Sequence, residues 1–200
     1  MPPCLPTLRK EPPEGPQWVH EVKFDGYRIQ IHKDGKHVAL YSKNGNDFTT
    51  RYPSIAEAVA NLPTKAVILD AELTACAEDG RSDFSALLGK GENELCVWVF
   101  DILSQLGKDL RPLSLIARRW KLDKLMDRVK SPTIRYSETF SHPTPLLAAC
   151  AERGMEGIVS KRVDRPYRSG PCKEWVKVKC AAWRESNQWR HEFFSKDKYK

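Results

Sequence analysis

The sequence predicts a single mixed α/β domain of the α+β class, with strands and helices interspersed along the chain. Its 200 residues, 40% of them hydrophobic and 30% charged, are enough to bury a substantial core. Short continuous apolar runs at 66–69 and 95–100 are typical of buried strands. Asp34-Gly35 separates two further strand-like segments, 28–32 and 37–42, and this arrangement predicts a β-hairpin.

The other elements are predicted from apolar spacing and from the residues that begin or end a helix. Residues 1–16 are rich in proline and predict an irregular lead-in, whereas 181–200 predicts a short helical tail with many basic and aromatic residues. The expected helices are 53–59, 84–88 behind a Ser82-Asp83 cap, 115–126 with either Arg119 or Trp120 turned inward, and 146–153 closed by Gly154. The remaining expected strands are 18–22, 156–162 and 175–179. Residues 17–180 are therefore expected to form the one domain.

Composition narrows the class of protein. Lysine and arginine outnumber aspartate and glutamate by 33 to 26, and the net charge of +7 favours a polyanionic partner. No apolar run approaches the ~20 residues that span a bilayer, and the N-terminus lacks the features of a signal peptide. The six cysteines contain no Cys-x-x-Cys pair, which argues against structural zinc. We therefore expect a protein of the reducing cytoplasm without membrane association.

The most informative stretch is 23–28, Lys-Phe-Asp-Gly-Tyr-Arg. It follows a predicted strand, and Asp25-Gly26 then predicts a sharp turn. If Lys23 and Asp25 are both extended, they share one face of the chain and Phe24 points to the other. A partly buried lysine among other cations loses its proton more easily and becomes a nucleophile. Taken by itself, the motif more often marks an exposed Lys-Asp pair beside a turn.

A second unusual arrangement is 175–179, Trp-Val-Lys-Val-Lys. In a strand the two valines face one side, while Lys177 and Lys179 project together from the other. Two neighbouring ammonium groups favour an anion such as phosphate, although a solvated edge strand has the same pattern. Four carboxylates at predicted strand ends could hold a hard cation or serve as ordinary caps; they are Asp70, Glu72, Asp101 and Glu156.

Other catalytic templates are absent from the sequence. Gly89-Lys90-Gly91 is not a P-loop, because the upstream glycine and the following serine or threonine are missing. The chain holds neither a Gly-x-Gly-x-x-Gly dinucleotide fingerprint nor a Gly-x-Ser-x-Gly nucleophile elbow. Hydrolase and dehydrogenase functions are therefore disfavoured.

The order of six short motifs is more specific than any one of them. They are 23–28 (KFDGYR), 42–45 (SKNG), 69–73 (LDAEL), 99–101 (VFD), 156–161 (EGIVSK) and 175–179 (WVKVK). In this order they resemble the covalent nucleotidyltransferase superfamily of DNA ligases, RNA ligases and mRNA capping enzymes. The likeness is greatest to the ATP-dependent ligase domain of bacterial end-joining DNA ligases. It implies the nucleotidyltransferase fold, with antiparallel β-sheets flanked by helices; the family's usual C-terminal oligonucleotide-binding barrel is not expected in this chain.

The resemblance implies a reaction centre around Lys23. This lysine would attack the α-phosphate of ATP and carry AMP as a phosphoramidate, while Lys177 and Lys179 would grip that phosphate. Glu156 would bind Mg²⁺ or Mn²⁺, with Asp25 as a second metal ligand. Because the attack needs a neutral amine, we expect burial and neighbouring cations to push the pKa of Lys23 below its ordinary value of ~10.4.

The resemblance also implies residues that bind the nucleoside. Arg28 and Glu72 would hold the ribose, and Phe100 would stack on adenine. Glu21 and Val22 would touch the adenine edge through their backbone groups.

Three features depart from the family pattern. Lys43 replaces the usual arginine of the second motif; it would still bind the nucleotide, but without the bidentate guanidinium fork. Ala71 replaces a usual glycine. Only residues 180–200 follow Lys179, too few for the barrel, and we expect this tail to form a helix that packs back on the domain.

Three functions remain open on the sequence. The first is an ATP-dependent DNA ligase or adenylyltransferase domain, the second an RNA ligase or capping-type enzyme, and the third a non-catalytic relic that binds nucleotide or nucleic acid. Retention of Lys23, Glu156 and the paired lysines argues against the relic. We expect the first function: a monomer that acts on nicked or broken double-stranded DNA with other end-joining or repair proteins, in the cytoplasm at the nucleoid.

Overall fold

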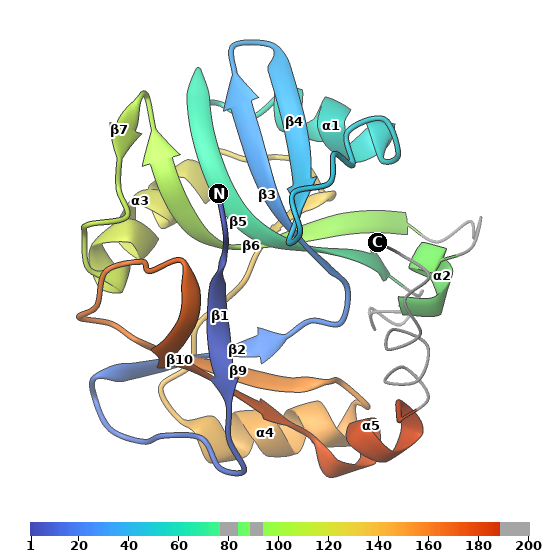
Figure 1. Ribbon diagram of the computed structural model, residues 1–200, viewed down its shortest axis with the longest axis vertical. Helices are drawn as coiled ribbons and strands as arrows, with labels where there is room; N and C mark the ends of the chain where they lie inside the picture. Colours follow the sequence, from blue (N-terminus) through green and yellow to red (C-terminus); the bar gives the residue numbers. More distant parts are fainter. Residues whose placement is uncertain (77–83, 89–93, 189–200) are drawn as a thin grey trace.

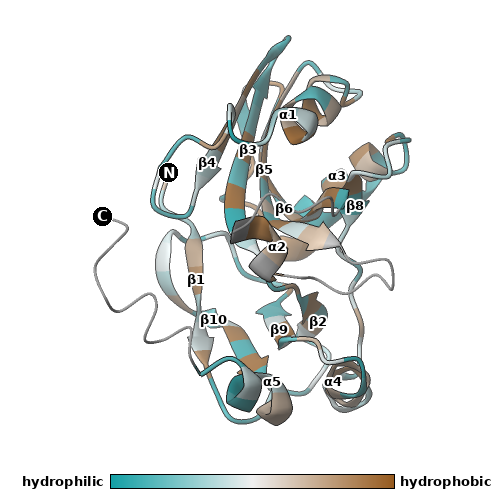
Figure 2. Cartoon of the chain, turned by 90° about the vertical axis from the view of Figure 1, so that its right-hand side faces the viewer, coloured by the Kyte–Doolittle hydropathy of each residue, from teal (hydrophilic) through white to brown (hydrophobic). Residues whose placement is uncertain are grey.

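The strands of the protein form two sheets, which lie one above the other in Figure 1. This computed structural model describes residues 1–76, 84–88 and 94–188, and every structural statement below refers to them. We call the six-stranded sheet the large sheet and the four-stranded sheet the small sheet. Seen from the side in Figure 2, α1 and α3 lie beside the large sheet, and α4 and α5 lie below the small sheet.

The large sheet has the order β4-β3-β5-β6-β7, with β8 beside β6. Its strands are β3 (Tyr27–Asp34), β4 (His37–Ser42), β5 (Ala66–Cys76), β6 (Glu94–Gln105), β7 (Lys108–Asp109) and β8 (Ile134–Tyr136). All neighbours are antiparallel except β6 and β8. Alternate strand residues such as Ile29, Ile31 and Leu69 pack against α1 (Pro53–Ala60), α2 (Phe84–Leu88) and α3 (Leu115–Met126), and they form the main core.

The small sheet has the order β1-β10-β9-β2 and joins both ends of the described chain. Its strands are β1 (Cys4–Leu8), β2 (Trp18–Lys23), β9 (Gly157–Arg162) and β10 (Gly170–Lys179). Apolar and hydrophilic residues alternate along β10, as Figure 2 shows. Its buried valines, Val176 and Val178, pack with Ile158 against α4 (Pro143–Glu152). The short helix α5 (Ala181–Ser186) follows β10 almost at once.

A third cluster of buried residues fills the space between the sheets. It consists of Cys4, Phe100, Leu103, Tyr167, Cys172 and Trp175. Beside it, Arg118 of α3 makes a fully buried two-point ion pair with Asp101 of β6, at 2.8 Å for both contacts. The same guanidinium donates to the Leu113 carbonyl at 2.7 Å, which leaves its charge and most of its N–H groups satisfied.

Most of the predicted elements are confirmed. The hairpin forms around Gly35, whose φ of +58° suits glycine, and α4 ends before Gly154 at φ +65°. In α3 it is Arg119 that turns inward, while Trp120 is exposed. The short helical turn 84–88 is present as α2, but its predicted Ser82-Asp83 cap lies outside the described residues.

Three predicted elements differ in the structure. The lead-in 1–16 is not wholly irregular, because Cys4–Leu8 forms β1 and pairs in parallel with β10. The strands predicted at 66–69 and 95–100 continue to Cys76 and Gln105, so Asp70, Glu72 and Asp101 lie inside strands and not at their ends. The strands β7 and β8 were not predicted at all.

No described helix is long and apolar enough to cross a membrane.

Candidate active site

A cavity of about 1890 Å³ lies between the two sheets and takes its lining from both of them. Every residue to which the resemblance gives a role lines it, whereas Asp70 and Asp101 do not. From the small sheet and its approach come Glu21, Val22, Lys23, Asp25, Glu156, Lys177 and Lys179, and from the large sheet and its loops come Arg28, Lys43, Glu72 and Phe100. The structure therefore brings all these candidates to one site, although they are spread over 159 positions, from 21 to 179.

Strand register explains how the lysines meet. Lys23 of β2 and Lys179 of β10 both pair with Gly157, on either side of the central strand β9. Side chains opposite one another in a sheet point to the same face. A Cβ on Gly157 would stand 2.0 Å from the Val178 carbonyl oxygen, and its φ is +148°, so only glycine fits here. The missing side chain lets β9 lie close to the backbone of β10 at Val178 and Lys179.

Glu156 holds the two lysines, one with each oxygen. Its Oε2 accepts from Lys23 Nζ at 2.7 Å, and its Oε1 accepts from Lys179 Nζ at 2.8 Å. Burial would raise the pKa of Glu156, but the two ammonium groups outweigh burial and lower it. The carboxylate is therefore charged, and it neutralises one of the two positive charges beside it.

The predicted low pKa of Lys23 is wrong for the protein without ligands. Burial does lower the pKa, as expected, but the carboxylates of Glu156, Glu72 and Asp25 outweigh it and raise the pKa above the ordinary value. The acidic neighbours of Lys23 therefore outweigh the effect of burial. Lys177 shows the predicted effect, because burial and the charges of Lys23 and Lys179 lower its pKa.

Glu72 lies in the same electrostatic field but has no basic partner at hydrogen-bond distance among the described contacts. Burial raises its pKa to about 7, although Lys23 and Arg28 act in the opposite direction. Glu72 pairs across the large sheet with Arg28 of β3 on one side and with Trp98 on the other. Its carboxyl group therefore changes charge near neutral pH at the wall of the cavity.

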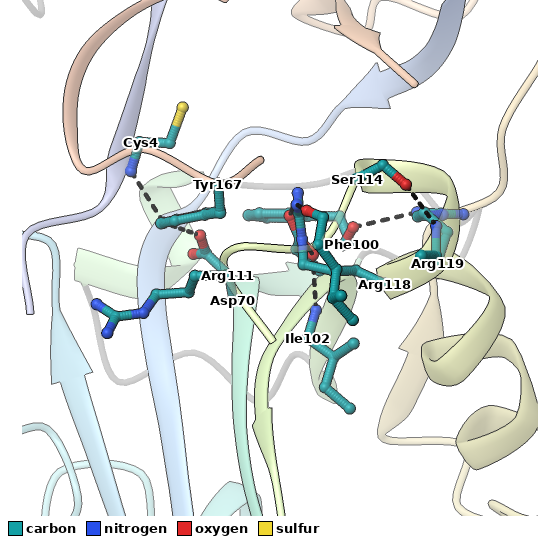
Figure 3. A network of polar contacts seen from close by, with 12 residues as sticks. Cys4, Asp70, Phe100, Ile102, Arg111, Ser114, Arg118, Arg119 and Tyr167 are labelled. Carbon is teal, nitrogen blue, oxygen red and sulfur yellow. Dashed lines mark hydrogen bonds and ion pairs between the residues drawn. The ribbon is translucent and has the colours of Figure 1, made fainter. Parts of the chain in front are cut away.

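Arg28 is fixed by a buried acceptor set. Its Nε and Nη2 donate to the two oxygens of Asp70 at 2.9 and 2.6 Å, and its Nη1 donates to the Cys4 carbonyl at 2.6 Å. The Tyr167 hydroxyl donates to Asp70 at 2.6 Å and accepts from the Cys4 N–H at 2.9 Å (Figure 3). Asp70 and Asp101, considered as cation ligands on the sequence, are thus both committed to arginines.

Glu21 is also committed to side-chain partners. Its carboxylate accepts from Lys161 at 2.7 Å, from Arg119 at 3.2 Å and from the Ser137 hydroxyl at 3.0 Å. Arg119 donates in addition to the Phe100 carbonyl at 3.2 Å, which ties β2 to β6 across the two sheets (Figure 3). The side chain of Glu21 therefore supports the wall of the cavity, in keeping with the prediction that only its backbone would meet a ligand.

Lys161 is a site residue that the sequence analysis missed. Its side chain is only 2% exposed, and its Nζ lies 4.4 Å from the ring centroid of Phe100 and 4.2 Å from that of Trp175. Burial lowers its pKa. The alternation of β9 could have found it, because Gly157, Val159 and Lys161 share the face that looks into the cavity.

The tail after β10 contributes a second aromatic partner. Trp183 of α5 lies over Lys179, with the ammonium 4.4 Å from the centre of the ring, and it lines the cavity. The predicted helix of the tail is present as α5 and contacts α4. The tail also contains Trp189, Phe193 and Phe194, which lie outside the described residues.

A family model for the ATP-dependent DNA ligase domain matches residues 7–179, nearly the whole of this fold. The chain belongs to the ATP-dependent DNA ligase domain family. Among curated relatives, the chain is 39% identical over 184 residues to the multifunctional non-homologous end joining protein LigD of Pseudomonas aeruginosa. That alignment covers 89% of this chain and 22% of the Pseudomonas protein. The chain is 32% identical over 198 residues to a probable DNA ligase of Nocardioides, of which it covers 38%. The chain thus spans only a minor part of these relatives.

Solved ligase structures share the fold of this ligase domain. A mycobacterial DNA ligase D complexed with ATP and MES superposes with a TM-score of 0.78 at 30% identity, over 89% of this chain and 60% of that one. The Chlorella virus DNA ligase-adenylate, at 15% identity, matches with a TM-score of 0.60 over 90% of this chain and 69% of that one, which shows the fold alone. The predicted nucleotidyltransferase fold is confirmed, with two parallel strand pairs in otherwise antiparallel sheets.

In this ligase domain, Lys43 and Asp25 keep their predicted places. Lys43 follows β4 directly and is exposed at the cavity wall, and its N–H donates to the Arg28 carbonyl at 3.0 Å. Asp25 lines the cavity two residues after Lys23 and contributes to the field that keeps this lysine charged. The reason for Gly26 differs from the predicted one. Its φ is not positive, but a Cβ there would stand 2.0 Å from the Leu73 carbonyl oxygen.

Proposed function

We propose that this domain adenylates itself with ATP on Lys23 and passes the AMP to the 5′-phosphate of nicked double-stranded DNA. The observation that carries the proposal is the ion-paired row of Lys23, Glu156 and Lys179 at the floor of one cavity. In this row a candidate nucleophile, Lys23, and a cation that can bind a phosphate, Lys179, both contact the carboxylate of Glu156. The relatives named as DNA ligases support the choice of DNA over RNA.

The transfer proceeds by exchange of bonds at phosphorus. The neutral Nζ of Lys23 attacks the α-phosphorus of ATP, an N–P bond forms, the bond to the bridging oxygen breaks, and pyrophosphate leaves with that electron pair. The proton of Nζ passes to solvent. Lys177 and Lys179 stabilise the negative charge that gathers on the phosphate oxygens. In the second step a DNA 5′-phosphate oxygen replaces the lysine, and in the third a 3′-hydroxyl displaces AMP.

The nucleoside would lie against the large sheet. Arg28 and Glu72 would hold the ribose, and the Phe100 ring, which lines the cavity, would stack on adenine. Arg28 is held in place by Asp70, so it needs little reorganisation to meet a ligand. The backbone of Glu21 and Val22 would meet the adenine edge, and Lys43 would bind the nucleotide at the outer wall.

The residues of the site fit a magnesium ion that is completed by phosphate oxygens. The described residues contain no cluster of three or more His, Cys, Asp or Glu side chains that could hold a metal alone. Mg²⁺ commonly binds through one or two carboxylates, substrate phosphates and water, which suits Glu156 with Asp25 nearby. Such an ion would offset phosphate charge and would compete with Lys23 for Glu156.

Labelling with ATP that is radioactive at the α-phosphate tests the first step. With Mg²⁺ the protein should become labelled, and Lys23→Ala should remain unlabelled. Lys36→Ala, which removes an exposed lysine in the hairpin turn, is the matched control and should label like wild type. The second assay offers a nick that already carries AMP, with either DNA or RNA strands. Joining of RNA alone would favour the RNA-directed alternative, and failure of both assays would leave a nucleotide-binding module.

We further propose that the protein works in the cytoplasm at the nucleoid, as a monomer beside other end-joining or repair proteins. The name of the Pseudomonas relative, a multifunctional end-joining protein, supports this setting. This chain covers only 22% of that relative. Joining of the pre-adenylated nick in the second assay therefore also tests whether the chain seals a nick without further domains.

A further inference from the structure

Arg51 is held in the cavity wall by three aromatic rings. It lies between β4 and α1, with its guanidinium carbon 5.7 Å from the ring centre of Tyr27, 5.5 Å from Phe48 and 5.3 Å from Tyr52. Its Nη2 also donates to the Leu87 carbonyl at 3.3 Å. These contacts restrict the long side chain to a small part of its normal range.

The rings around Arg51 hold one another as well. Tyr27 contacts Phe48 edge-on at 5.6 Å and Phe84 at 5.3 Å, and Phe48 contacts Tyr52 edge-on at 5.7 Å. Tyr27 belongs to the same short segment as Lys23, so this aromatic cluster is built onto the reaction centre. The position of the guanidinium is therefore fixed relative to the nucleophile before any ligand arrives.

The charge of Arg51 is not neutralised by the protein. Within the part of the chain that the structure describes, no carboxylate forms an ion pair with it, and its side chain is exposed. Arg28, Arg118 and Arg119, by contrast, each have a carboxylate partner. A guanidinium has five N–H donors in a planar fork, and among the described contacts Arg51 makes one hydrogen bond, to the Leu87 carbonyl. Arg51 is exposed and lines the cavity.

The place of Arg51 separates it from the lysines that would hold the nucleotide phosphates. Arg51 and Lys43 come from the loop that leaves the large sheet, whereas Lys177 and Lys179 come from the small sheet. The two lysines of the small sheet are partly buried, but Arg51 and Lys43 are exposed. An anion at Arg51 would therefore belong to a ligand that reaches the cavity from outside.

We propose that Arg51 is a binding site for a backbone phosphate of the DNA duplex beside the nick. The planar fork matches two non-bridging phosphate oxygens, a geometry that Lys43 cannot provide. The aromatic rings hold the Arg51 side chain in place, and its charge, which no described carboxylate neutralises, attracts the phosphate. This inference rests on the proposed function, because it takes DNA as the ligand of the same cavity.

The test measures binding of a nicked DNA duplex that already carries AMP at its 5′-phosphate, without ATP, across a range of salt concentrations. Arg51→Gln should weaken binding by about three- to tenfold at 0.1 M salt, and should reduce the slope of log K against log salt by about 0.9, the loss of one phosphate contact. Arg51→Lys keeps the charge and loses the fork; its salt slope should equal that of wild type, with an intermediate affinity.

Arg128→Gln is the matched control, since it removes an exposed arginine just beyond α3 that does not line the cavity. Equal affinities and slopes for Arg51→Gln and Arg128→Gln would overturn the proposal. So would a raised KM for ATP in Lys23 labelling with an unaltered DNA affinity, because Arg51 would then serve the nucleotide. Lack of salt-dependent DNA binding by wild type would overturn it as well. Failure of Lys23 labelling would instead count against the proposed function, since the binding test uses no ATP.

Discussion

Lys23 and Glu156 form an ion pair of 2.7 Å that keeps the expected nucleophile protonated. The same carboxylate binds Lys179 through its other oxygen. Of the carboxylates that raise the pKa of Lys23, Glu156 contributes most. If a metal ion binds Glu156 as proposed, we expect it to lower the pKa of Lys23.

Glu156→Gln should make Lys23 react with an amine-specific reagent at lower pH. The carboxylate raises the pKa of this lysine, so its removal leaves burial and the neighbouring cations to lower the pKa. Mass spectrometry of the modified peptide, without nucleotide or metal, gives the pH profile. Lys36 in the same sample is the internal control. A profile for Lys23 that stays in place or moves to higher pH would contradict the electrostatic assignment.

Glu72→Gln should stabilise the protein at pH 8. Because the pKa of Glu72 rises to about 7 in the folded state, the folded protein favours the protonated form, and stability from this group falls as pH rises from about 4.5 to 7. Glutamine does not ionise, so the variant keeps the stability that wild type loses between these pH values. We expect its free energy of unfolding at pH 8 to exceed that of wild type by roughly 2–3 kcal/mol. Urea unfolding at pH 5 and pH 8 measures it. Glu57→Gln, at an exposed position of α1, should not change the difference between the two pH values.

Asp70→Ala should be among the most destabilising changes in the domain. It leaves the Arg28 guanidinium buried without its carboxylate, at a cost of about 3–5 kcal/mol. Tyr167→Phe removes only the hydroxyl that joins Asp70 to Cys4 and should cost about 1–2 kcal/mol. Asp109→Ala breaks the exposed two-point pair with Arg111 and is the control, with only a small expected change. Similar losses for Asp70→Ala and Asp109→Ala in urea unfolding would refute the argument.

Gly26→Ala should disturb the fold, although the backbone angles of Gly26 are ordinary. The added Cβ would stand 2.0 Å from the Leu73 carbonyl oxygen, so the segment after Lys23 must move away from β5. We expect a loss of about 2–3 kcal/mol. In Gly45→Ala the added Cβ meets no atom within 4 Å, and the loss of stability comes only from the backbone φ of +86°, at about 1 kcal/mol. If the two variants unfold at the same denaturant concentration, close packing at Gly26 is not the cause.

Trp183→Leu should slow the labelling of Lys23 by roughly two- to fivefold, because it removes the ring that positions Lys179. Trp183→Phe retains a ring face and should recover part of the rate. Trp120→Leu is the control, since Trp120 is exposed on α3, lies beside Lys121 and is not among the residues that line the cavity. Equal rates for Trp183→Leu and wild type would show that Lys179 needs no support from α5.

The sequence predicted the local features of the site well. Alternation placed Lys177 and Lys179 on one face, and Asp34-Gly35 placed the hairpin, because both depend on neighbouring residues alone. The order of the motifs then brought together residues that no local pattern connects. The residues to which the resemblance gives a role all line one cavity, whereas Asp70 and Asp101, which the strand pattern alone suggested, do not.

What the sequence did not predict depends on contacts between distant segments. The pKa of Lys23 is raised mainly because Glu156, 133 positions later, meets it at 2.7 Å. The alternation of β9 turns Lys161 toward the cavity, but its contacts with Phe100 and Trp175 depend on other strands. The proline-rich segment Cys4–Leu8 forms β1 by pairing with β10, which lies more than 160 positions away.

The pairing of β1 with β10 has a consequence for how the domain folds during its synthesis on the ribosome. Thr7 donates to the carbonyl of Cys172, 165 positions away, so β1 can pair only after β10 has been synthesised. The large sheet can assemble while translation continues, but the small sheet closes only when β10 has emerged from the ribosome. We therefore expect the row of Lys23, Glu156 and Lys179 to be completed in a single late event, together with the closing of the small sheet.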